Sequence, residues 1–329
     1  MDSRASEARS KVTGVDADPP LLSIVVETQN DDPTHDIRLS ASLAALARQT
    51  VPISRCEVLV VVPRSSPGLA EAAQHGLPRA RVLVPDGDLG YGQMKMWGAR
   101  AASCEIVAFT DADCLVEPDW VAAALEGFRD APPMVAALQG LTRHAEGPGW
   151  QTATLLYCRA MWSPERRGRY LVLNNFAIRR AMFERFPFAD VAVRQNVERL
   201  MVARMLKAGH EIRIEPRMRA VHSYRGGLRS WFRRGRAEAF DRLETLERVH
   251  VLMESPGRVK AQSRLRGRLR HHTRRCRDVM KDLSRCRQEL EIGPGAMVVA
   301  RLAAITIWAG ACVGACQAGR GGPRPATDF

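Results

Sequence analysis

Two carboxylates one residue apart, Asp111 and Asp113, come directly after the apolar run at residues 105–110. A short continuous apolar run of this kind is typical of a buried parallel strand. Residues i and i+2 of a strand point to the same side, and open α/β sheets bind ligands in the crevice beyond the carboxyl ends of their strands. A hard divalent cation held by one or two carboxylates completes its shell with water and phosphate oxygens. The pair therefore indicates a metal site for a diphosphate, with a solvated turn at the end of a strand as the plainer alternative.

The segments before the acid pair predict the framework that positions it. Apolar runs and helical spacing alternate along this part of the chain. They predict strands at 21–26, 57–62, 81–84 and 105–110, and helices at 39–48, 69–75 and 93–103. Such alternation is typical of an α/β fold with a Rossmann-type, mostly parallel sheet flanked by helices. The loops after these strands would then build the crevice.

Four segments carry a resemblance to a known family. They are residues 23–30 at the first strand and its loop, residues 90–100, the acid pair with Pro118-Asp119-Trp120 after it, and residues 174–180 with the phenylalanines at 183, 186 and 188. In this order and spacing they resemble the nucleotide-sugar glycosyltransferases of the large inverting family that has a GT-A fold and includes cellulose and chitin synthases. The likeness runs from about residue 21 to about residue 240, roughly two thirds of the chain.

The resemblance implies a GT-A-like fold, a nucleotide-diphosphate sugar as donor, transfer to an acceptor hydroxyl with inversion, and Mn²⁺ or Mg²⁺ as cofactor. It also implies roles for individual residues. Donor contacts are expected from Glu27, Asn30, Lys95, Asp111, Arg233 and Arg234, metal contacts from Asp113, Asp111 and His222, and acceptor contacts from Asn174, Asn175 and Asn196.

The end of the second strand departs from the family pattern. The family usually has a pair of acids there that hold the base and ribose, whereas residues 61–66 contain no acid. Glu27, or Asp86 and Asp88 after the third strand, could supply the missing carboxylate. Asp-Gly-Asp is also an ordinary turn sequence, so both interpretations of residues 86–88 stay open.

Glu198 is the candidate catalytic base. In the family a Glu-Asp pair opens a helix that ends in Arg-x-x-x-Ala-Gly, and counting back from Arg204 places Val197 and Glu198 at that pair. A carboxylate near the start of the helix at 196–207 is favoured by the helix dipole, and one acid suffices to deprotonate a hydroxyl. Helix capping is the alternative role for Glu198.

His222 follows the last strand of the expected domain. A neutral imidazole there could be a third metal ligand or contact the diphosphate, and it could equally be a satisfied polar residue. Five arginines follow with aromatic residues between them, at 225, 229, 233, 234 and 236. Guanidinium groups match phosphate oxygens, so this stretch could bind the leaving diphosphate or form a solvated helix face.

Composition sets the outer bounds. At 329 residues and 46% hydrophobic residues, the chain can hold one α/β domain, expected at 21–240, plus an appendage. Residues 1–20 lack an apolar core and are expected to be a disordered leader. Eight cysteines without a C-x-x-C pair suggest reduced thiols rather than disulfides or a zinc site.

The positive charge is concentrated behind this domain. Residues 258–287 contain twelve lysines or arginines against two aspartates, which is ten of the thirteen net charges. Residues 241–290 are therefore expected to form a basic helical segment. Nucleic acid is not expected as a partner, because no aromatic residue lies between 258 and 290 to stack on bases. Anionic lipid headgroups fit better.

An apolar helix is expected within 291–318, followed by a tail at 319–329. Residues 296–316 are apolar except for Arg301 and Thr306, and as a helix they would extend about 31 Å, close to the thickness of the bilayer hydrocarbon. Gly310 and Gly314 form a G-x-x-x-G packing face. A span, an in-plane or re-entrant helix, and a helix packed on the domain all stay open. The basic segment and this helix together predict a position at the cytoplasmic face of the cell membrane, with a lipid-linked or cell-envelope glycan expected as the acceptor.

Two other functions remain at this point. A nucleotidyltransferase on a similar sheet would need a glycine-rich phosphate loop after the first strand, and residues 27–30 lack it. A degenerate nucleotide-sugar-binding or scaffold protein would account for the acids missing at Val62-Pro63 and Val197.

Overall fold

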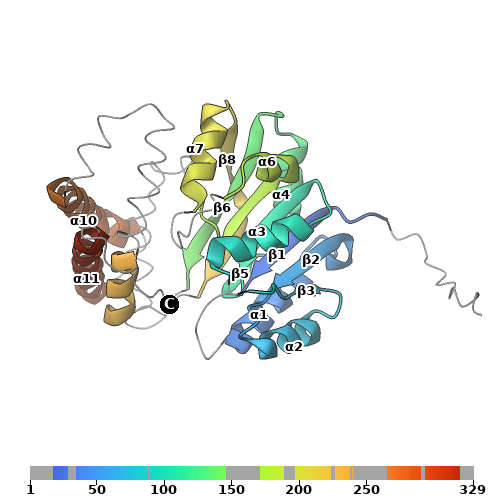
Figure 1. Ribbon diagram of the computed structural model, residues 1–329, viewed down its shortest axis with the longest axis horizontal. Coiled ribbons are helices and arrows are strands. Elements are labelled where there is room, and N and C mark those ends of the chain that lie inside the picture. Colours follow the sequence, from blue (N-terminus) through green and yellow to red (C-terminus); the bar gives the residue numbers. More distant parts are fainter. Residues whose placement is uncertain are drawn as a thin grey trace, which may run out of the picture.

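We analysed a computed structural model, which describes residues 18–28, 35–87, 89–145, 171–188, 197–223, 227–237, 239, 265–289 and 293–318. Its centre is an eight-stranded sheet in the order β3-β2-β1-β4-β7-β6-β8-β5 (Figure 1). The mixed, mostly parallel sheet with helices on both faces confirms the GT-A-like α/β fold expected from the sequence.

The first half of the sheet is parallel. Its strands are β1 (Leu22–Glu27), β2 (Cys56–Val61), β3 (Arg81–Leu83) and β4 (Ile106–Asp111). They are joined through α1 (His35–Ala47), the short η1 (Ile53–Arg55), α2 (Pro67–Gly76) and α3 (Tyr91–Ala101). β1 and β4 lie in the middle and are buried almost throughout, as their apolar sequences predict. Their carboxyl ends, Glu27 and Asp111, are register neighbours.

The second half of the sheet is mixed. β7 (Asn175–Arg179) runs antiparallel to β4 and to β6 (Val135–His144). β8 (Glu211–His222) runs parallel to β6 and antiparallel to the short β5 (Cys114–Val116). The helices of this half are α4 (Trp120–Arg129), α6 (Arg180–Arg185) and α7 (Glu198–Lys207).

A hydrophobic core lies on each face of the sheet. On one face, α1 contributes Leu39 and Leu43, α4 contributes Trp120, and α2 packs beside them. On the other face, α3 and α7 pack with the stacked rings of Phe109 and Phe176. α3 lies so close to β1 that a Cβ on Gly98 would come 2.4 Å from a methyl of Val25. This glycine therefore sets how near α3 and its polar residues come to the sheet.

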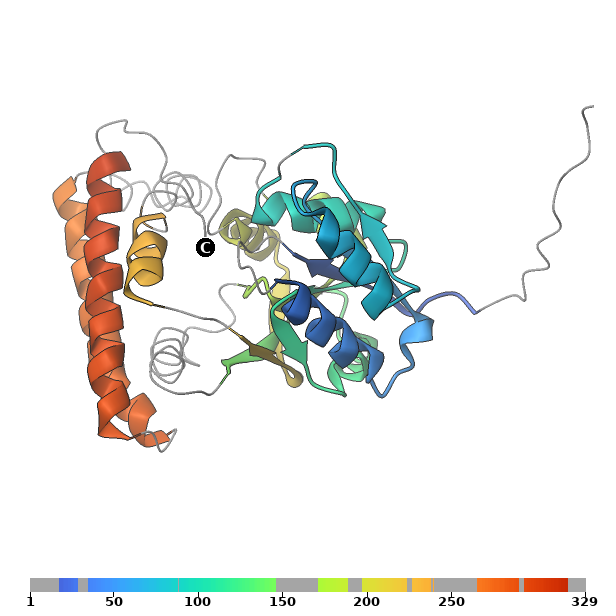
Figure 2. The ribbon, with the colours of Figure 1, turned by 90° about the horizontal axis from the view of Figure 1, so that it is seen from below.

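Two long helices form a hairpin beside the sheet domain (Figures 1 and 2). They are α10 (Leu265–Glu289) and α11 (Pro294–Ala318). α10 buries Val279, Leu283 and Cys286 against Ala304 and Ile307 of α11. By length and composition α11 could cross a membrane. Of its most apolar 18-residue stretch, 39% is buried within the protein.

Candidate active site

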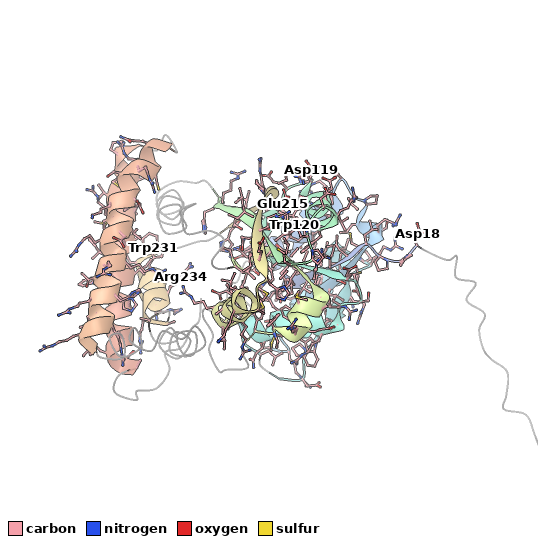
Figure 3. All side chains as sticks on the ribbon, turned by 90° about the horizontal axis from the view of Figure 1, so that it is seen from above. Asp18, Asp119, Trp120, Glu215, Trp231 and Arg234 are labelled. Carbon is pink, nitrogen blue, oxygen red and sulfur yellow. The ribbon has the colours of Figure 1, made fainter. Side chains whose placement is uncertain are left out.

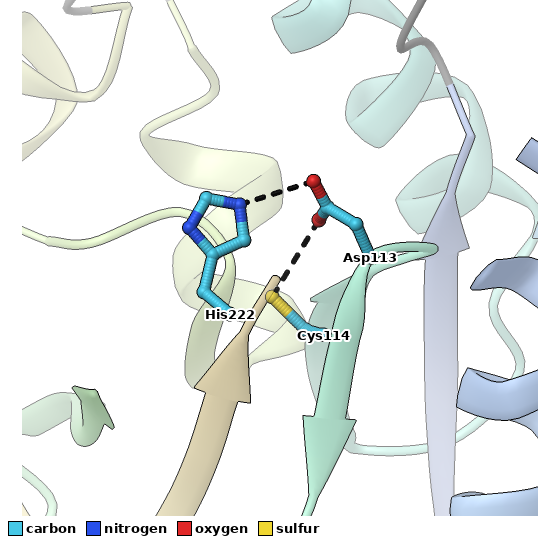
Figure 4. Close-up of side chains that lie close together, drawn as sticks. All are labelled: Asp113, Cys114 and His222. Atoms are coloured by element: carbon cyan, nitrogen blue, oxygen red, sulfur yellow. Dashed lines mark hydrogen bonds and ion pairs between the residues drawn. The ribbon is translucent and has the colours of Figure 1, made fainter. Parts of the chain in front are cut away.

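Four side chains meet at the turn where β4 passes into β5. β8 runs between β5 and β6, and its last residue, His222, lies opposite Cys114 on one side and His144 on the other. His222 Nε2 is 3.1 Å from Oδ2 of Asp113, and the Cys114 thiol donates to Asp113 Oδ1 at 3.8 Å (Figure 4). One ligand atom each from Asp113, Cys114 and His222 lie within 4.8 Å of one another. This spacing is compact enough for a single cation.

The electrostatics of the pair favour opposite charges. Burial alone would raise the pKa of Asp113, but the charges of His222 and then Arg38 lower it below its usual value. Burial alone would lower the pKa of His222, but Asp113 and then Asp111 raise it above its usual value. A carboxylate is therefore held beside an imidazole whose proton a bound cation would displace into solvent.

The donor set fits a divalent metal ion. Carboxylate oxygen suits Mn²⁺ and Mg²⁺, and a neutral imidazole nitrogen is the commonest metal ligand in proteins. Cys114 is wholly buried, and burial followed by the charges of Asp113 and Asp111 raises its pKa well above the ordinary value. It thus stays a thiol in this arrangement and adds a soft sulfur atom beside the carboxylate and the imidazole.

His144 was not identified from the sequence. Its ring meets the His222 ring edge-on at 5.1 Å between centroids, and its pKa is lowered to about 3 by burial, then by His222 and Arg234. It is therefore a neutral imidazole that packs against His222. Only the register of β6 against β8 reveals this neighbour, and the sequence carries no local signal for it.

Asp111 has a different set of partners from Asp113. Its carboxylate accepts a hydrogen bond from the Tyr91 hydroxyl at 2.9 Å and lies 2.5 Å from the Lys95 ammonium. Lys95 is wholly buried and also lies over the Tyr91 ring at 4.8 Å. Burial and then Asp111 raise the pKa of Tyr91 well above its ordinary value. Lys95 thus neutralises Asp111 from within the protein, whereas the sequence led us to expect it facing the nucleotide.

The partnership of Tyr91 and Lys95 had a signal in the sequence. The two residues are four apart in a helix, so they project from one face onto the neighbouring strand end. Asp111 as a metal ligand, and Lys95 and Asp111 as donor contacts, stay predictions.

Glu27 lies at the end of β1, wholly buried and in register with Asp111 and Val61. Thr28 next to it donates its hydroxyl to the Val61 carbonyl at 2.9 Å and closes the strand end. Asp86 is exposed in the turn after β3. Asn30 and Asp88 lie outside the described residues. Glu27 therefore lies beside the end of β2, where the sequence lacks the expected acid.

The two asparagines on the expected acceptor side have clear partners. Asn175 is wholly buried, accepts from the Trp120 indole at 2.7 Å and donates to the Met218 carbonyl at 3.0 Å. Its amide therefore joins α4, β7 and β8, a structural role that the sequence did not indicate. Asn174 is half-buried and accepts from the Thr142 hydroxyl at 3.1 Å. Asn196 lies outside the described residues.

Glu198 is the first residue of α7 and is 9% exposed. One of its carboxylate oxygens lies 3.9 Å from Nε of Arg199. Val197 before it packs on the start of α3, where a Cβ on Gly92 would come 2.8 Å from a Val197 methyl. The helix start that carries Glu198 is therefore anchored beside the one that carries Tyr91.

Arg233 and Arg234 lie in the helical residues 228–237, between the hairpin and the sheet domain (Figure 2). The positive charge of Arg234 contributes to lowering the pKa of His144 and opposes the rise in the pKa of His222. Arg234 is thus close enough to act on the Asp113–His222 pair.

The sheet order and the acid at the β4–β5 turn define a GT-A-type α/β protein. The model of the family described as Glycosyl transferase family 2 matches residues 23–191, more than half of the chain, and the protein belongs to this family. The subgroup of cellulose and chitin synthases, named in the sequence resemblance, stays an expectation.

Two relatives are validoxylamine A glucosyltransferases from Streptomyces hygroscopicus, of subspecies limoneus and jinggangensis. They are 32% and 31% identical to this chain over 128 residues, which is 38% of this chain and 27% and 29% of theirs. The chain thus matches less than a third of the length of these relatives.

Among solved structures, a mannosyltransferase from Pyrobaculum calidifontis in complex with GDP-Man and Mn²⁺ resembles this chain with a TM-score of 0.56 and 18% identity. The alignment covers 91% of this chain and 87% of that protein. At this identity the likeness supports the fold.

Proposed function

We propose that this protein is a metal-dependent, inverting glycosyltransferase that moves a sugar from a nucleotide-diphosphate donor to an acceptor hydroxyl. The observation that carries the proposal is the Asp113–His222 pair, 3.1 Å apart, beside the buried acids at the ends of β1 and β4. Family membership supports the transfer chemistry.

Asp113 and His222 would hold the cation, Mn²⁺ or Mg²⁺. The bound ion would neutralise negative charge on the diphosphate. In the Pyrobaculum calidifontis protein, the same fold was solved with GDP-Man and Mn²⁺. Asp111, held by the half-buried Tyr91 and the buried Lys95, would present a fixed polar edge to the donor.

The chemical step would be a single displacement. The acceptor oxygen attacks the anomeric carbon while the bond from that carbon to the diphosphate oxygen breaks, and the diphosphate leaves with the bonding electrons. Glu198 takes the proton of the acceptor hydroxyl on a carboxylate oxygen. Arg233 and Arg234 would bind the departing diphosphate through guanidinium hydrogen bonds.

The acceptor is proposed to be a lipid-linked or cell-envelope glycan, because the hairpin has features of a membrane-surface element. Six basic side chains of α10 are exposed and follow each other at spacings of three or four residues, so they form one stripe along the helix. They are Arg266, Arg270, Arg274, Arg277, Lys281 and Arg285. This stripe, called the basic stripe below, lies on the opposite side of α10 from Val279 and Leu283, which pack on α11.

We further propose that α11 lies in the plane of the membrane surface. One side of α11 packs on α10, and the other exposes Val298, Leu302, Ile305 and Val313 at helical spacing. α10 runs alongside α11, and its charged side chains cannot enter hydrocarbon without a large cost. The cytoplasmic face fits best, since its leaflet carries the anionic lipids that attract basic residues.

A thermal-shift panel tests the proposed function. UDP, GDP, ADP and dTDP are each added with and without Mn²⁺, because a ligand that binds the native state stabilises it by mass action. At least one nucleotide should raise the melting temperature more with Mn²⁺ than without it. No Mn²⁺-dependent shift for any of the four would overturn the metal and donor assignment.

Product analysis then separates the remaining functions. A glycosyltransferase incubated with its nucleotide sugar and Mn²⁺ releases a nucleoside diphosphate. Release is slow when the sugar is transferred to water and fast when it is transferred to an acceptor. A nucleotidyltransferase supplied with a nucleoside triphosphate releases pyrophosphate, and a scaffold protein releases nothing.

A further inference from the structure

The helical residues 228–237 touch α11 backbone to backbone at three glycines. A Cβ on Gly310 would lie 2.0 Å from the carbonyl oxygen of Phe232, and a Cβ on Gly314 would lie 2.1 Å from that of Arg236. From the other side, a Cβ on Gly235 would lie 2.1 Å from the carbonyl oxygen of Ile307. Real Cβ atoms do not approach so closely, so any residue larger than glycine would push the two helices apart.

Side chains extend this contact. Trp231 is 1% exposed and belongs to the core shared by α10 and α11. The Arg236 guanidinium donates through Nε to the side-chain oxygen of Gln317 at 2.7 Å. The position and rotation of residues 228–237 are therefore fixed by the hairpin.

Arg234 lies on a flank of the same helical residues. At 3.6 residues per turn, Arg233 and Ala237 project away from Trp231 and Gly235, whereas Arg234 lies about 100° around the helix axis from Gly235. In Figure 3 Trp231 lies nearer to the hairpin and Arg234 nearer to the sheet domain. The charge of Arg234 is felt by both His144 and His222. One short helix thus connects the hairpin to the Asp113–His222 pair.

We infer that the glycine contact of α11 positions Arg234 for the diphosphate of the donor, which makes the hairpin part of the donor site as well as a membrane-facing element. The inference rests on the proposed function, since it assigns a ligand to that site. Removal of the chain from residue 255 onward would take away no residue expected to contact the donor, yet it would strip Trp231 and Gly235 of their packing partners.

The test compares two alanine substitutions in the same helix. Gly310→Ala adds a methyl group at the contact, whereas Gly295→Ala adds it where nothing lies within 4 Å. Both remove the helix-weakening effect of glycine, so their difference reports the contact. The probe is whichever of UDP, GDP, ADP and dTDP the wild type binds best with Mn²⁺. Gly310→Ala should weaken its binding roughly tenfold or more, as expected for loss of a charge-assisted hydrogen bond, and Gly295→Ala should leave it unchanged.

A double-mutant cycle shows whether the effect passes through Arg234. Arg234→Gln should weaken nucleotide binding in the wild type by a similar factor. In the Gly310→Ala background it should add little, because the side chain is already displaced. Additive losses would mean that Gly310 acts by another route, and the positioning role would be wrong.

Amide hydrogen exchange reads the contact independently of any nucleotide. Gly310→Ala should speed exchange in residues 228–237, with circular dichroism confirming that the protein is folded. Gly235→Ala adds a methyl group at the same contact from the other helix. It should also weaken nucleotide binding and speed exchange, so the conclusion does not depend on one variant that could misfold. Equal nucleotide affinity of wild type and Gly310→Ala overturns the positioning alone. A wild type that binds none of the four nucleotides overturns the proposed function, and with it the diphosphate ligand assigned to Arg234.

Discussion

The two acids of the D-x-D segment differ in their neighbours because the strand ends between them. β4 stops at Asp111 and β5 begins at Cys114, so the chain turns around Ala112. Asp111 consequently faces α3 and meets Lys95, whereas Asp113 faces β8 and meets His222. A metal ion near Asp113 would be close to an already neutralised Asp111. The two carboxylates can then share one small site without strong repulsion.

The first prediction concerns the metal. Asp113→Asn keeps the shape of the side chain but removes the negative charge, so the Mn²⁺-dependent part of nucleotide affinity should fall by at least roughly 10–100-fold, the range known for less direct metal contacts. Isothermal titration with and without Mn²⁺ measures it. Asp130→Asn, an exposed change after α4, is the control. Retained Mn²⁺ dependence in Asp113→Asn would rule out this residue as a ligand.

The second prediction separates chemistry from binding at Glu198. Glu198→Gln keeps size and hydrogen bonding but cannot accept a proton, so turnover should fall by roughly 10²–10⁴ while donor affinity stays nearly unchanged. Single-turnover kinetics with the nucleotide sugar and an acceptor measure it. Glu211→Gln, at the exposed start of β8, should behave like the wild type. If Glu198→Gln turns over normally, Glu198 serves only the helix start.

At the scale of elements, the parallel half was predictable from the sequence and the mixed half was not. Strands such as Leu22–Glu27 and helices such as Tyr91–Ala101 follow local hydrophobic patterns, and the expected boundaries fall within a few residues of those observed. β5 has only three residues, and its pairing with the far end of β8 depends on contacts distant in sequence. The position of His144 beside His222 likewise became visible only through the register of β6 against β8.

The candidate site divides in the same way. The family resemblance assigned Asp113 and His222 to one metal site, and the structure brings them together although they are 109 residues apart in the chain. Their role as metal ligands stays a prediction. The partners of buried groups could not be placed, because the sequence does not tell which polar group lies opposite another across packed elements. Lys95 on Asp111 and Asn175 on Trp120 are both of this kind.

The third prediction concerns one carboxylate that joins several elements. Glu57 of β2 accepts hydrogen bonds from Ser23 of β1 at 2.6 Å and from the Ser103 amide after α3 at 2.8 Å, and it pairs with Arg81 of β3 at 2.8 Å. Burial raises its pKa, but these hydrogen bonds and then Arg81 outweigh burial, so the pKa is below its usual value. Glu57 is therefore bound more strongly when ionised.

The sign of the pH dependence follows. A carboxyl group with a lowered pKa in the folded state stabilises the fold above its unfolded pKa of about 4.3, and this contribution is lost as the pH falls through the folded pKa. Glu57→Gln should thus unfold more easily than the wild type at pH 7, and the difference should shrink in acid. Urea unfolding at several pH values measures it, with Glu71→Gln on the exposed face of α2 as control. A difference that does not change with pH would leave packing, not charge, as the cause.

At the scale of the whole molecule, the two roles proposed for the hairpin need not interfere. Its buried side holds residues 228–237 through glycine contacts, and its exposed sides carry the basic stripe of α10 and the apolar residues of α11. The glycines at 310 and 314 that resembled a membrane packing motif are already used within the chain. A lipid surface can therefore contact the hairpin while the arginines of residues 228–237 stay at the active site.

The last prediction concerns membrane binding. Full-length protein should co-sediment with vesicles that contain anionic lipid. Binding should weaken as salt is raised, because at 0.1 M salt the attraction between exposed charges is largely screened beyond about 10 Å. Changing Arg270, Arg274, Arg277 and Lys281 to Gln should weaken binding by about 4 kcal/mol, or roughly a thousandfold, at about 1 kcal/mol for each basic residue.

The control changes four exposed arginines of the sheet domain, Arg48, Arg64, Arg79 and Arg129, to Gln and should bind nearly as well as the wild type. The binding that remains at high salt should require detergent for release, since the exposed apolar residues of α11 are insensitive to screening. Full-length protein that stays in solution with anionic vesicles at low salt would show that the hairpin serves the active site alone.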